Sequence, residues 1–312
     1  MLVSCVAAFA VPFHLFLFVY AVLGPLHYLT EISWLHDRGY YASGGRGRRW
    51  WLALVALTTG VLLLGYATSM PPKYEIGCVY LVFVSALMLH FVRHRASAVA
   101  LTLMAAGTLA LASTSAGYFV LAYLLVTVIH VFVFTAAFVL HGALRTRSWP
   151  AMASLGVMIA CAVTFFVVTP PAAAPSASLR ALYEFFAPLN AQLLRLFGYT
   201  TRDVFGSRGG AAVMRFIAFS YTYHYLNWFS KTSVIKWHEV SRSRAVAIIA
   251  MWIAAVGIFA FDYRVGISVL YALSLLHVML EFPLNHRTIV ALLDVRSLPS
   301  RVTAPARKPG LA

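Results

Sequence analysis

Long apolar runs recur along the chain and are separated by short segments that hold most of the charged residues. A bilayer core about 30 Å thick requires about 20 predominantly apolar residues in each helix that crosses it. This pattern predicts an all-α transmembrane helical bundle of about nine spans. The predicted spans are residues 2–23, 50–70, 74–92, 96–113, 117–142, 151–170, 211–229, 245–262 and 264–282.

One long loop, residues 171–210, separates the sixth and seventh predicted spans. A Pro- and Ala-rich stretch (169–178) leads into a mainly apolar, aromatic run with few charges, residues 179–197. This run predicts a helix in the outer membrane interface, bent at Pro188, and a re-entrant segment is the alternative. Residues 1–298 are expected to form one transmembrane domain, and residues 299–312 a disordered basic cytoplasmic tail.

The composition excludes a soluble domain. Hydrophobic residues make up 62% of the chain and charged residues 11%, with a mean hydropathy of +0.82, whereas soluble domains are about half apolar and a quarter charged. The formal net charge of +15 would favour a nucleic-acid partner in a soluble protein. Here the basic residues fall in short clusters between apolar runs, so we expect no nucleic-acid partner.

The basic residues also predict the orientation of the chain. Of the 24 Lys and Arg residues, 17 fall in alternate loops and the C-terminal tail, and seven fall on the opposite side. Cytoplasmic loops carry the excess of Lys and Arg. The N-terminus is therefore predicted outside and the C-terminus in the cytoplasm, in a multi-pass protein of a bacterial inner membrane.

The histidines gather on one side of this predicted topology. Ten of the eleven lie at or toward the cytoplasmic side, and His14 is the exception. Three pairs of metal-ligating residue types are spaced four apart, which places both side chains on one helix face, about 5–6 Å apart at the Cβ atoms. These pairs are His27 with Glu31, His90 with His94, and His277 with Glu281.

Together these residues predict a metal site beneath the cytoplasmic surface. The predicted ligands are His27, His90, His94, His141, His224 and His277. Further candidates are His130, His286 and Asn227; His130 and His141 share a helix face, but their separation of about 16 Å along the axis prevents them from binding one ion. Glu31 and Glu281 are the predicted catalytic residues, either as direct ligands or as acceptors that orient the imidazoles. The alternative is that each histidine is an ordinary polar residue at the membrane interface.

Imidazole and carboxylate ligands suit iron, zinc or manganese, and the lack of a thiolate among them argues against copper(I). Lys231 and Lys236 lie beside Ser230, Thr232 and Ser233 at the end of the seventh predicted span. They are candidates for binding the phosphate or carboxylate headgroup of a substrate. The alternative for these two residues is ordinary anchoring at the cytoplasmic surface.

Four short segments resemble membrane-bound non-haem iron enzymes, namely fatty-acid desaturases and hydroxylases and the bacterial membrane carotene-cleaving dioxygenases. The segments are GPLHYLTE (24–31), HFVRH (90–94), TYHYLNWF (222–229) and LLHVMLEF (275–282). The resemblance implies iron as the cofactor, oxygen chemistry on a lipid or isoprenoid substrate, and a cytoplasmic electron donor. The paired HxxHH boxes of the desaturases are absent from this chain.

Other function classes remain open at this point. In a proton-coupled transporter, His130, Glu31 and Glu281 would relay protons across the membrane. A metal-independent transferase acting on lipid headgroups would use a histidine base, with Lys231 or Lys236 holding a phosphate. An assembly role is a further alternative.

Overall fold

The computed structural model describes residues 1–40, 46–68, 72–91, 120–170, 175–200, 203–236 and 239–294, with six further residues between 99 and 110. All the regular secondary structure in this part of the chain is helical, which confirms the predicted all-α class. Five helical stretches are long and apolar enough to cross a membrane, as expected for a multi-pass membrane protein. They are Pro12–Asp37, Thr127–Thr146, Trp149–Val167, Arg242–Phe261 and Tyr263–Leu293.

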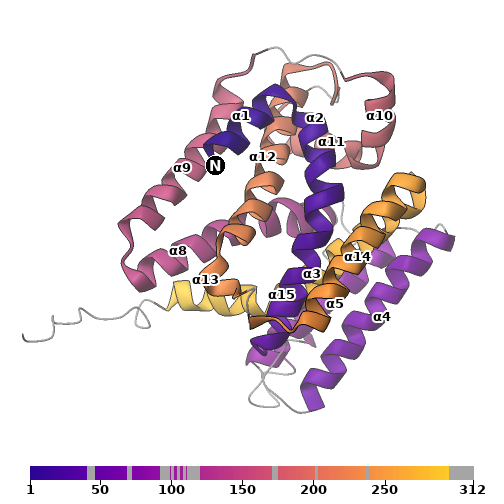
Figure 1. The fold of residues 1–312 in the computed structure, drawn as a ribbon, viewed down its shortest axis with the longest axis vertical. Helices are drawn as coiled ribbons and strands as arrows, with labels where there is room; N and C mark the ends of the chain where they lie inside the picture. Colours follow the sequence, from indigo (N-terminus) through magenta and orange to yellow (C-terminus); the bar gives the residue numbers. More distant parts are fainter. Residues whose placement is uncertain are drawn as a thin grey trace, which may run out of the picture.

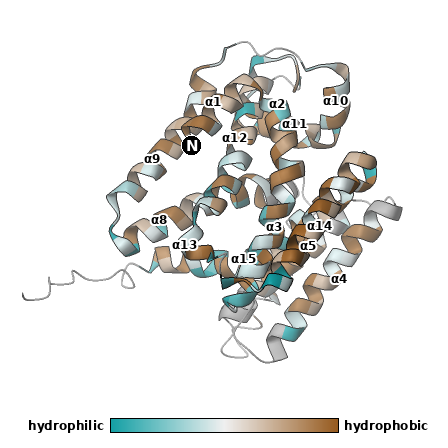
Figure 2. Cartoon of the chain, viewed as in Figure 1, coloured by the Kyte–Doolittle hydropathy of each residue, from teal (hydrophilic) through white to brown (hydrophobic). Residues whose placement is uncertain are grey.

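The surface of the bundle agrees with this assignment. In α14 (Arg242–Phe261) and α9 (Trp149–Val167), only 11% and 22% of the most apolar window is buried. Figure 2 shows that hydrophobic residues recur along both helices. Contiguous exposed apolar surface of this kind is unfavourable in water. These helices are therefore suited to contact lipid.

The N-terminal segment differs from the single helix predicted at residues 2–23. Helix α1 (Leu2–Ala10) ends at Val11, and Pro12 begins α2 (Pro12–Phe18), where its missing N–H costs nothing. The helix then continues through a π-helical segment, η1 (Val19–Leu23), into α3 (Gly24–Asp37). The predicted end at residue 23 is wrong because the π segment accommodates Pro25, whose ring would clash with the carbonyl four residues earlier in a regular α-helix.

The later spans follow the prediction more closely. Helices α4 (Arg46–Thr68) and α5 (Pro72–Phe91) pair with each other, and α15 (Tyr263–Leu293) packs against both, as well as against α3 and α14. Helix α15 continues beyond the predicted end at residue 282, with Pro283 inside it. The predicted span 96–113 falls mostly outside the described residues, and the predicted tail 299–312 falls wholly outside them.

The predicted fifth span also departs from regular α geometry. It begins as a π-helical stretch, η2 (Val120–Phe134), and continues as α8 (Thr135–Thr146). Arg147 then adopts the left-handed conformation with φ 52°, and Ser148 caps α9 by accepting a hydrogen bond from the amide of Ala151. A short turn thus joins the two helices, which contact each other.

Helix α12 (Arg208–Ser230) is the centre of the bundle. Every residue from Gly209 to Tyr225 is buried, and α12 packs against α1, α2, α9, α11 and η2 (Figure 1). It is not among the five most apolar stretches, because it carries Arg215, His224 and several hydroxyl side chains. Polar residues in membrane helices face the interior of the bundle, so the central position of α12 follows from its composition. The short helix α13 (Thr232–Ile235) follows it.

The long loop folds back onto this centre. It contains α10 (Ala177–Tyr183), a 3-10 turn (Glu184–Phe186) and α11 (Ala187–Leu196). Pro188 lies in the first turn of α11, so the break comes where the sequence predicts a bend. The buried side chains of Tyr183 and Phe186 lie in the same apolar core as residues of α2 and α12. The interfacial position of this segment, the count of nine spans and the orientation of the chain stay predictions.

Candidate metal centre

Four buried imidazoles from four helical segments meet inside the bundle. They are His27 on α3, His130 on η2, His224 on α12 and His277 on α15, each at most 8% exposed. The Nε2 atoms of His27 and His224 are 3.0 Å apart, and those of His130 and His277 are 3.1 Å apart. His27, His224 and His277 each offer a ligand atom within 4.8 Å of those of the other two. This group could hold a metal ion.

Two carboxyl groups flank the imidazoles. Glu31 and Glu281 are both 3% exposed, and their carboxyl groups lie close enough to act electrostatically on each other. Glu31 Oε2 lies 3.1 Å from His27 Nε2, so the contact predicted from their i, i+4 spacing is present. Glu281 Oε2 lies 3.1 Å from Nδ1 of His130, so this carboxylate bridges two helices. The four histidines and two glutamates form one connected cluster, which we call the His–Glu cluster.

A threonine defines the tautomer of His224. The hydroxyl of Thr135 donates to the carbonyl of Val131 at 2.8 Å and lies 2.7 Å from His224 Nδ1. Because a hydroxyl has one proton, Nδ1 of His224 must be the donor in the second contact, which leaves a lone pair on Nε2. The Glu281 carboxylate lies 3.1 Å from Nδ1 of His130 and is the oxygen group next to that nitrogen. Metal-binding imidazoles typically donate their second ring nitrogen to an oxygen acceptor in this manner.

The spacing of the imidazole nitrogens fits a metal ion. Two nitrogens bound to one ion at about 2.0–2.1 Å and at a right angle lie about 3.0 Å apart. The His27–His224 and His130–His277 distances of 3.0 and 3.1 Å match this value. Imidazole lone pairs that face each other so closely repel unless a proton or a cation lies between them. Nitrogen and carboxylate donors without a thiolate suit iron, zinc or manganese.

Aromatic side chains hold the imidazoles in place. Tyr28 stacks on His277 at 4.3 Å between ring centroids, and its hydroxyl hydrogen bonds to that of Tyr225 at 2.6 Å. Gly24 leaves room for this pair, because a Cβ at this position would lie 3.0 Å from the Tyr28 hydroxyl. The Trp228 ring packs edge-on against His27 at 5.6 Å. Sequence analysis missed these supporting residues and Thr135. The sequence did contain a signal for them. Tyr28 and Tyr225 each stand next to a candidate ligand in the sequence, and Thr135 is a hydroxyl residue within an apolar run.

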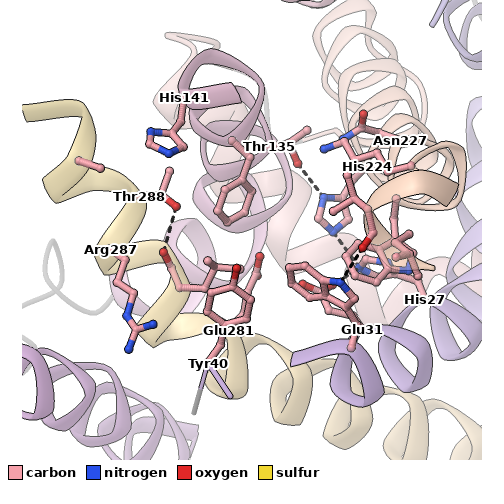
Figure 3. Close-up of a pocket in the computed structure, with 18 of the residues that line it drawn as sticks. His27, Glu31, Tyr40, Thr135, His141, His224, Asn227, Glu281, Arg287 and Thr288 are labelled. Carbon is pink, nitrogen blue, oxygen red and sulfur yellow. Dashed lines mark hydrogen bonds and ion pairs between the residues drawn. The ribbon is translucent and has the colours of Figure 1, made fainter. Parts of the chain in front are cut away.

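A cavity of about 390 Å³ opens from the His–Glu cluster. His27, His224, Glu31 and Glu281 line its inner part, and Trp34, Tyr40, Phe138, Trp228 and Leu284 form much of its apolar wall (Figure 3). Its volume lies in the range of small-molecule sites, about 300–1,000 Å³. Asn227 also lines the cavity, as does His141, which lies across it from His27 (Figure 3).

The structure does not gather all the predicted ligands. His141 lies on the cavity wall, three helical turns from His130. His286 is buried on α15 against Phe83 and Phe282, with ring centroids 4.7 and 6.4 Å away. His94 lies outside the described residues, and His90 lies in α5 with a side chain that the structure does not describe. Ligand roles for these four residues stay predictions.

The two candidate headgroup lysines lie in different places. Lys231 lines the cavity, whereas Lys236 lines a separate groove and forms an ion pair of 2.5 Å with Glu239. Burial lowers the pKa of the Lys231 ammonium below its ordinary value, and the carboxylates of Glu31 and Glu281 act in the opposite direction. Only Lys231 is therefore positioned to meet a molecule bound in the cavity.

No protein-family model, curated protein or solved structure matches this chain. The interpretation of the cluster therefore depends on its own geometry and chemistry.

Proposed function

We propose that the chain is an integral-membrane, metal-dependent oxidoreductase of the oxygenase, hydroxylase or desaturase type, with iron as its metal. His27, His130, His224 and His277 would hold one or two ions, with Glu31 and Glu281 as further ligands or as proton acceptors. The observation that carries this proposal is the convergence of four buried imidazoles and two carboxyl groups, with Nε2 atoms paired at 3.0 and 3.1 Å. The substrate would be a lipid or an isoprenoid, reached from the membrane.

When bound, the metal supplies activation of oxygen or of a bound water molecule. The chain's own residues prepare the site for that chemistry. Thr135 accepts a hydrogen bond from Nδ1 of His224 and so orients this ring, and the Glu281 carboxylate lies 3.1 Å from Nδ1 of His130. Glu31 and Glu281 can hold or release a proton beside the imidazoles. The apolar wall excludes water and offers contact to an apolar substrate. A cytoplasmic electron donor completes the proposed system.

Metal analysis of the purified protein tests this function. We expect full-length protein in a neutral detergent to carry at least one transition-metal ion per chain, measured by inductively coupled plasma mass spectrometry. Electron paramagnetic resonance and Mössbauer spectra should then identify iron with nitrogen and oxygen ligands. Protein isolated without chelators that holds no stoichiometric transition metal, and takes up none from an iron(II), zinc or manganese solution, would contradict the proposal.

A proton-coupled transporter is the second candidate function. It is favoured by the 3.1 Å contacts of Glu281 with His130 and of Glu31 with His27, since the two carboxyl groups also act electrostatically on each other and this set of groups could relay a proton. The two functions differ in one measurement. A transporter in sealed vesicles would move protons together with its substrate and would retain this transport after metal chelation, whereas a metal-dependent oxidoreductase would lose its activity.

A further inference from the structure

The cavity beside the His–Glu cluster carries opposite charges at its two ends. Lys231, Arg145 and Arg287 line it along with the two glutamates, which are the only carboxylates among its described lining residues. Glu31 and Glu281 are buried, Lys231 and Arg287 are half-buried, and Arg145 is exposed. The carboxylates therefore lie at the closed end of the cavity. The cations extend from Lys231, on which Glu31 and Glu281 act electrostatically, to the exposed Arg145. Figure 3 shows Arg287 across the cavity from His27, with Glu281 between them.

The same arrangement occurs on three helices. On α12, Lys231 follows His224 by about two turns, or about 10 Å along the axis. On α15, Arg287 follows Glu281 by about 9 Å, and on α8, Arg145 follows Thr135, the partner of His224, by about 15 Å. Each helix thus presents one group at the cluster and one cation two to three turns beyond it. Three separate elements thus contribute a cation to the lining of this cavity.

The lining side chains between these positions are apolar except for Asn227 and His141. Phe138 lies between Thr135 and Arg145 on α8, Leu284 between Glu281 and Arg287 on α15, and Trp228 between His224 and Lys231 on α12. All three line the cavity, and Val234 and Ile235 of α13 add further apolar surface. A bound molecule would therefore meet cations at one end, an apolar wall along its length and the imidazoles at the other end.

We infer that this cavity binds an anionic amphiphile, whose carboxylate or phosphate group lies at Lys231, Arg145 and Arg287 and whose apolar body extends toward the His–Glu cluster. The inference rests on the proposed function, because it assumes that a carbon of the bound molecule reacts at the His–Glu cluster. From the helical spacing given above, this carbon would lie about 9–15 Å from the anionic group. Arginine side chains favour carboxylate and phosphate because their guanidinium groups can donate two parallel hydrogen bonds. Lys236 is excluded from this site by its ion pair with Glu239 in the neighbouring groove.

Photoaffinity labelling tests the inference. The full chain, reconstituted in phosphatidylcholine nanodiscs, is labelled with dodecanoate that carries a diazirine at its last carbon. We expect label on α12 and α15 near the cluster, displaced by dodecanoate or dodecyl phosphate about tenfold better than by dodecanol, since one charged interaction is worth about this factor. The relative strength of the two competitors distinguishes a carboxylate ligand from a phosphate ligand.

Substitutions then locate the anionic group. Lys231→Gln and Arg145→Gln should each lower the affinity for dodecanoate about tenfold. Lys231→Arg keeps the charge and should bind within about twofold of wild type, which shows that the position tolerates replacement. Lys236→Gln is the matched control, because it removes a cation from the adjacent groove, and it should leave the affinity unchanged.

Three results would overturn the inference. Dodecanol could compete as well as dodecanoate, inorganic phosphate alone could displace the label as well as dodecyl phosphate, or the Lys231→Gln/Arg145→Gln double variant could bind like wild type. Metal content measured on the same samples separates the two claims. If the protein has its full metal content but binds dodecanol as well as dodecanoate, only the anion site is refuted. If metal-free protein still prefers dodecanoate to dodecanol, only the proposed function is refuted.

Discussion

Helix α12 carries two buried polar regions that are built in opposite ways. Toward its N-terminus, Tyr183 donates to Asn190 Oδ1 at 2.8 Å, Asn190 contacts the sulfur of Met214 at 3.3 Å, and Arg215 donates to the carbonyl of Pro170 at 2.9 Å. In this first region, three side-chain donors, from Tyr183, Asn190 and Arg215, meet acceptors from the chain itself. Toward the C-terminus of the helix, His224 belongs to the His–Glu cluster, where the imidazole nitrogens face one another.

The difference indicates which region holds the fold and which is available for chemistry. The first region ties α11 and the end of α9 to α12, so its hydrogen bonds contribute to stability. The His–Glu cluster confronts buried lone pairs and buried carboxyl groups, an arrangement that opposes folding unless protons or a cation compensate. Removing a polar group should therefore lower stability in the first region and metal affinity in the second.

The largest effect is expected from removing an imidazole. Loss of a group that only orients a metal ligand typically lowers metal affinity by a factor of about 10–100. His224→Ala and His277→Ala each remove a candidate ligand itself, so the loss of metal affinity should be larger than this. Metal content of monodisperse, size-exclusion-purified protein is the measurement. His14→Ala is the control, because His14 is exposed on α2, remote from the cluster in the chain. Equal metal content in all three variants would remove the distinction between the two regions.

The next effect concerns a positioning residue. Thr135→Val keeps the shape of the side chain but removes the acceptor for His224 Nδ1, so metal affinity should fall about tenfold. Thr135→Ser should restore it, because the hydroxyl returns. A competition titration with a chelator of known affinity measures both variants. A Thr135→Val protein with wild-type affinity would show that the tautomer of His224 does not depend on this contact.

A smaller effect, on stability alone, is expected in the first region. Tyr183→Phe removes the hydrogen bond to Asn190 and should cost about 1 kcal/mol, seen as a lower midpoint in thermal unfolding. Metal content should stay the same as in wild type. Phe185→Leu offers a comparison, since Phe185 is more exposed on the same short segment and should change the midpoint less. Loss of metal in Tyr183→Phe would mean that the two regions are not independent.

The smallest effect is a pH dependence at the open end of the cavity. Anion binding requires a charged Lys231, and burial lowers the pKa of this side chain below about 10.5 despite Glu31 and Glu281. Affinity for dodecanoate should therefore decline as pH rises toward 10, at a lower pH than for an ordinary lysine. The total loss should be less than about tenfold, because Arg145 and Arg287 stay charged.

Lys231→Arg provides the control for this pH dependence, since a guanidinium stays protonated throughout the range. Its affinity should be flat where that of wild type declines. Identical profiles for the two proteins would assign the decline to a group other than Lys231.

Sequence alone predicted the features that depend on local spacing. The apolar runs indicated an all-α membrane bundle, and the i, i+4 spacing of His27 and Glu31 predicted a contact that the structure contains. The end of the first span could not be located in the same way. Hydropathy is uniform across residues 2–23, whereas Val11 interrupts the helix and the π segment carries it past Pro25.

Features that depend on how the helices pack against one another could not be predicted from the sequence. His130 and His141 lie on one helix face, and nothing in their spacing shows which of them lies at the depth of His277. The packing of η2 against α15 decides this, because it brings His130 Nε2 within 3.1 Å of His277 Nε2. The separation of Lys231 from Lys236 is decided in the same way, by a left-handed residue at Lys236 that ends α13.

The π-helical segments have a consequence for how such a site can arise or disappear. Gly24 at the end of η1 donates its amide to Val19, five residues earlier, and η2 contains His130. A π turn holds an additional residue, so deleting one residue there would let the helix return to α geometry. Residues on one side of the deletion would then rotate by about 100° relative to those on the other. Single-residue length changes could thus create or abolish the cluster in a lineage while every histidine is retained, and histidine content alone would not identify its functional members.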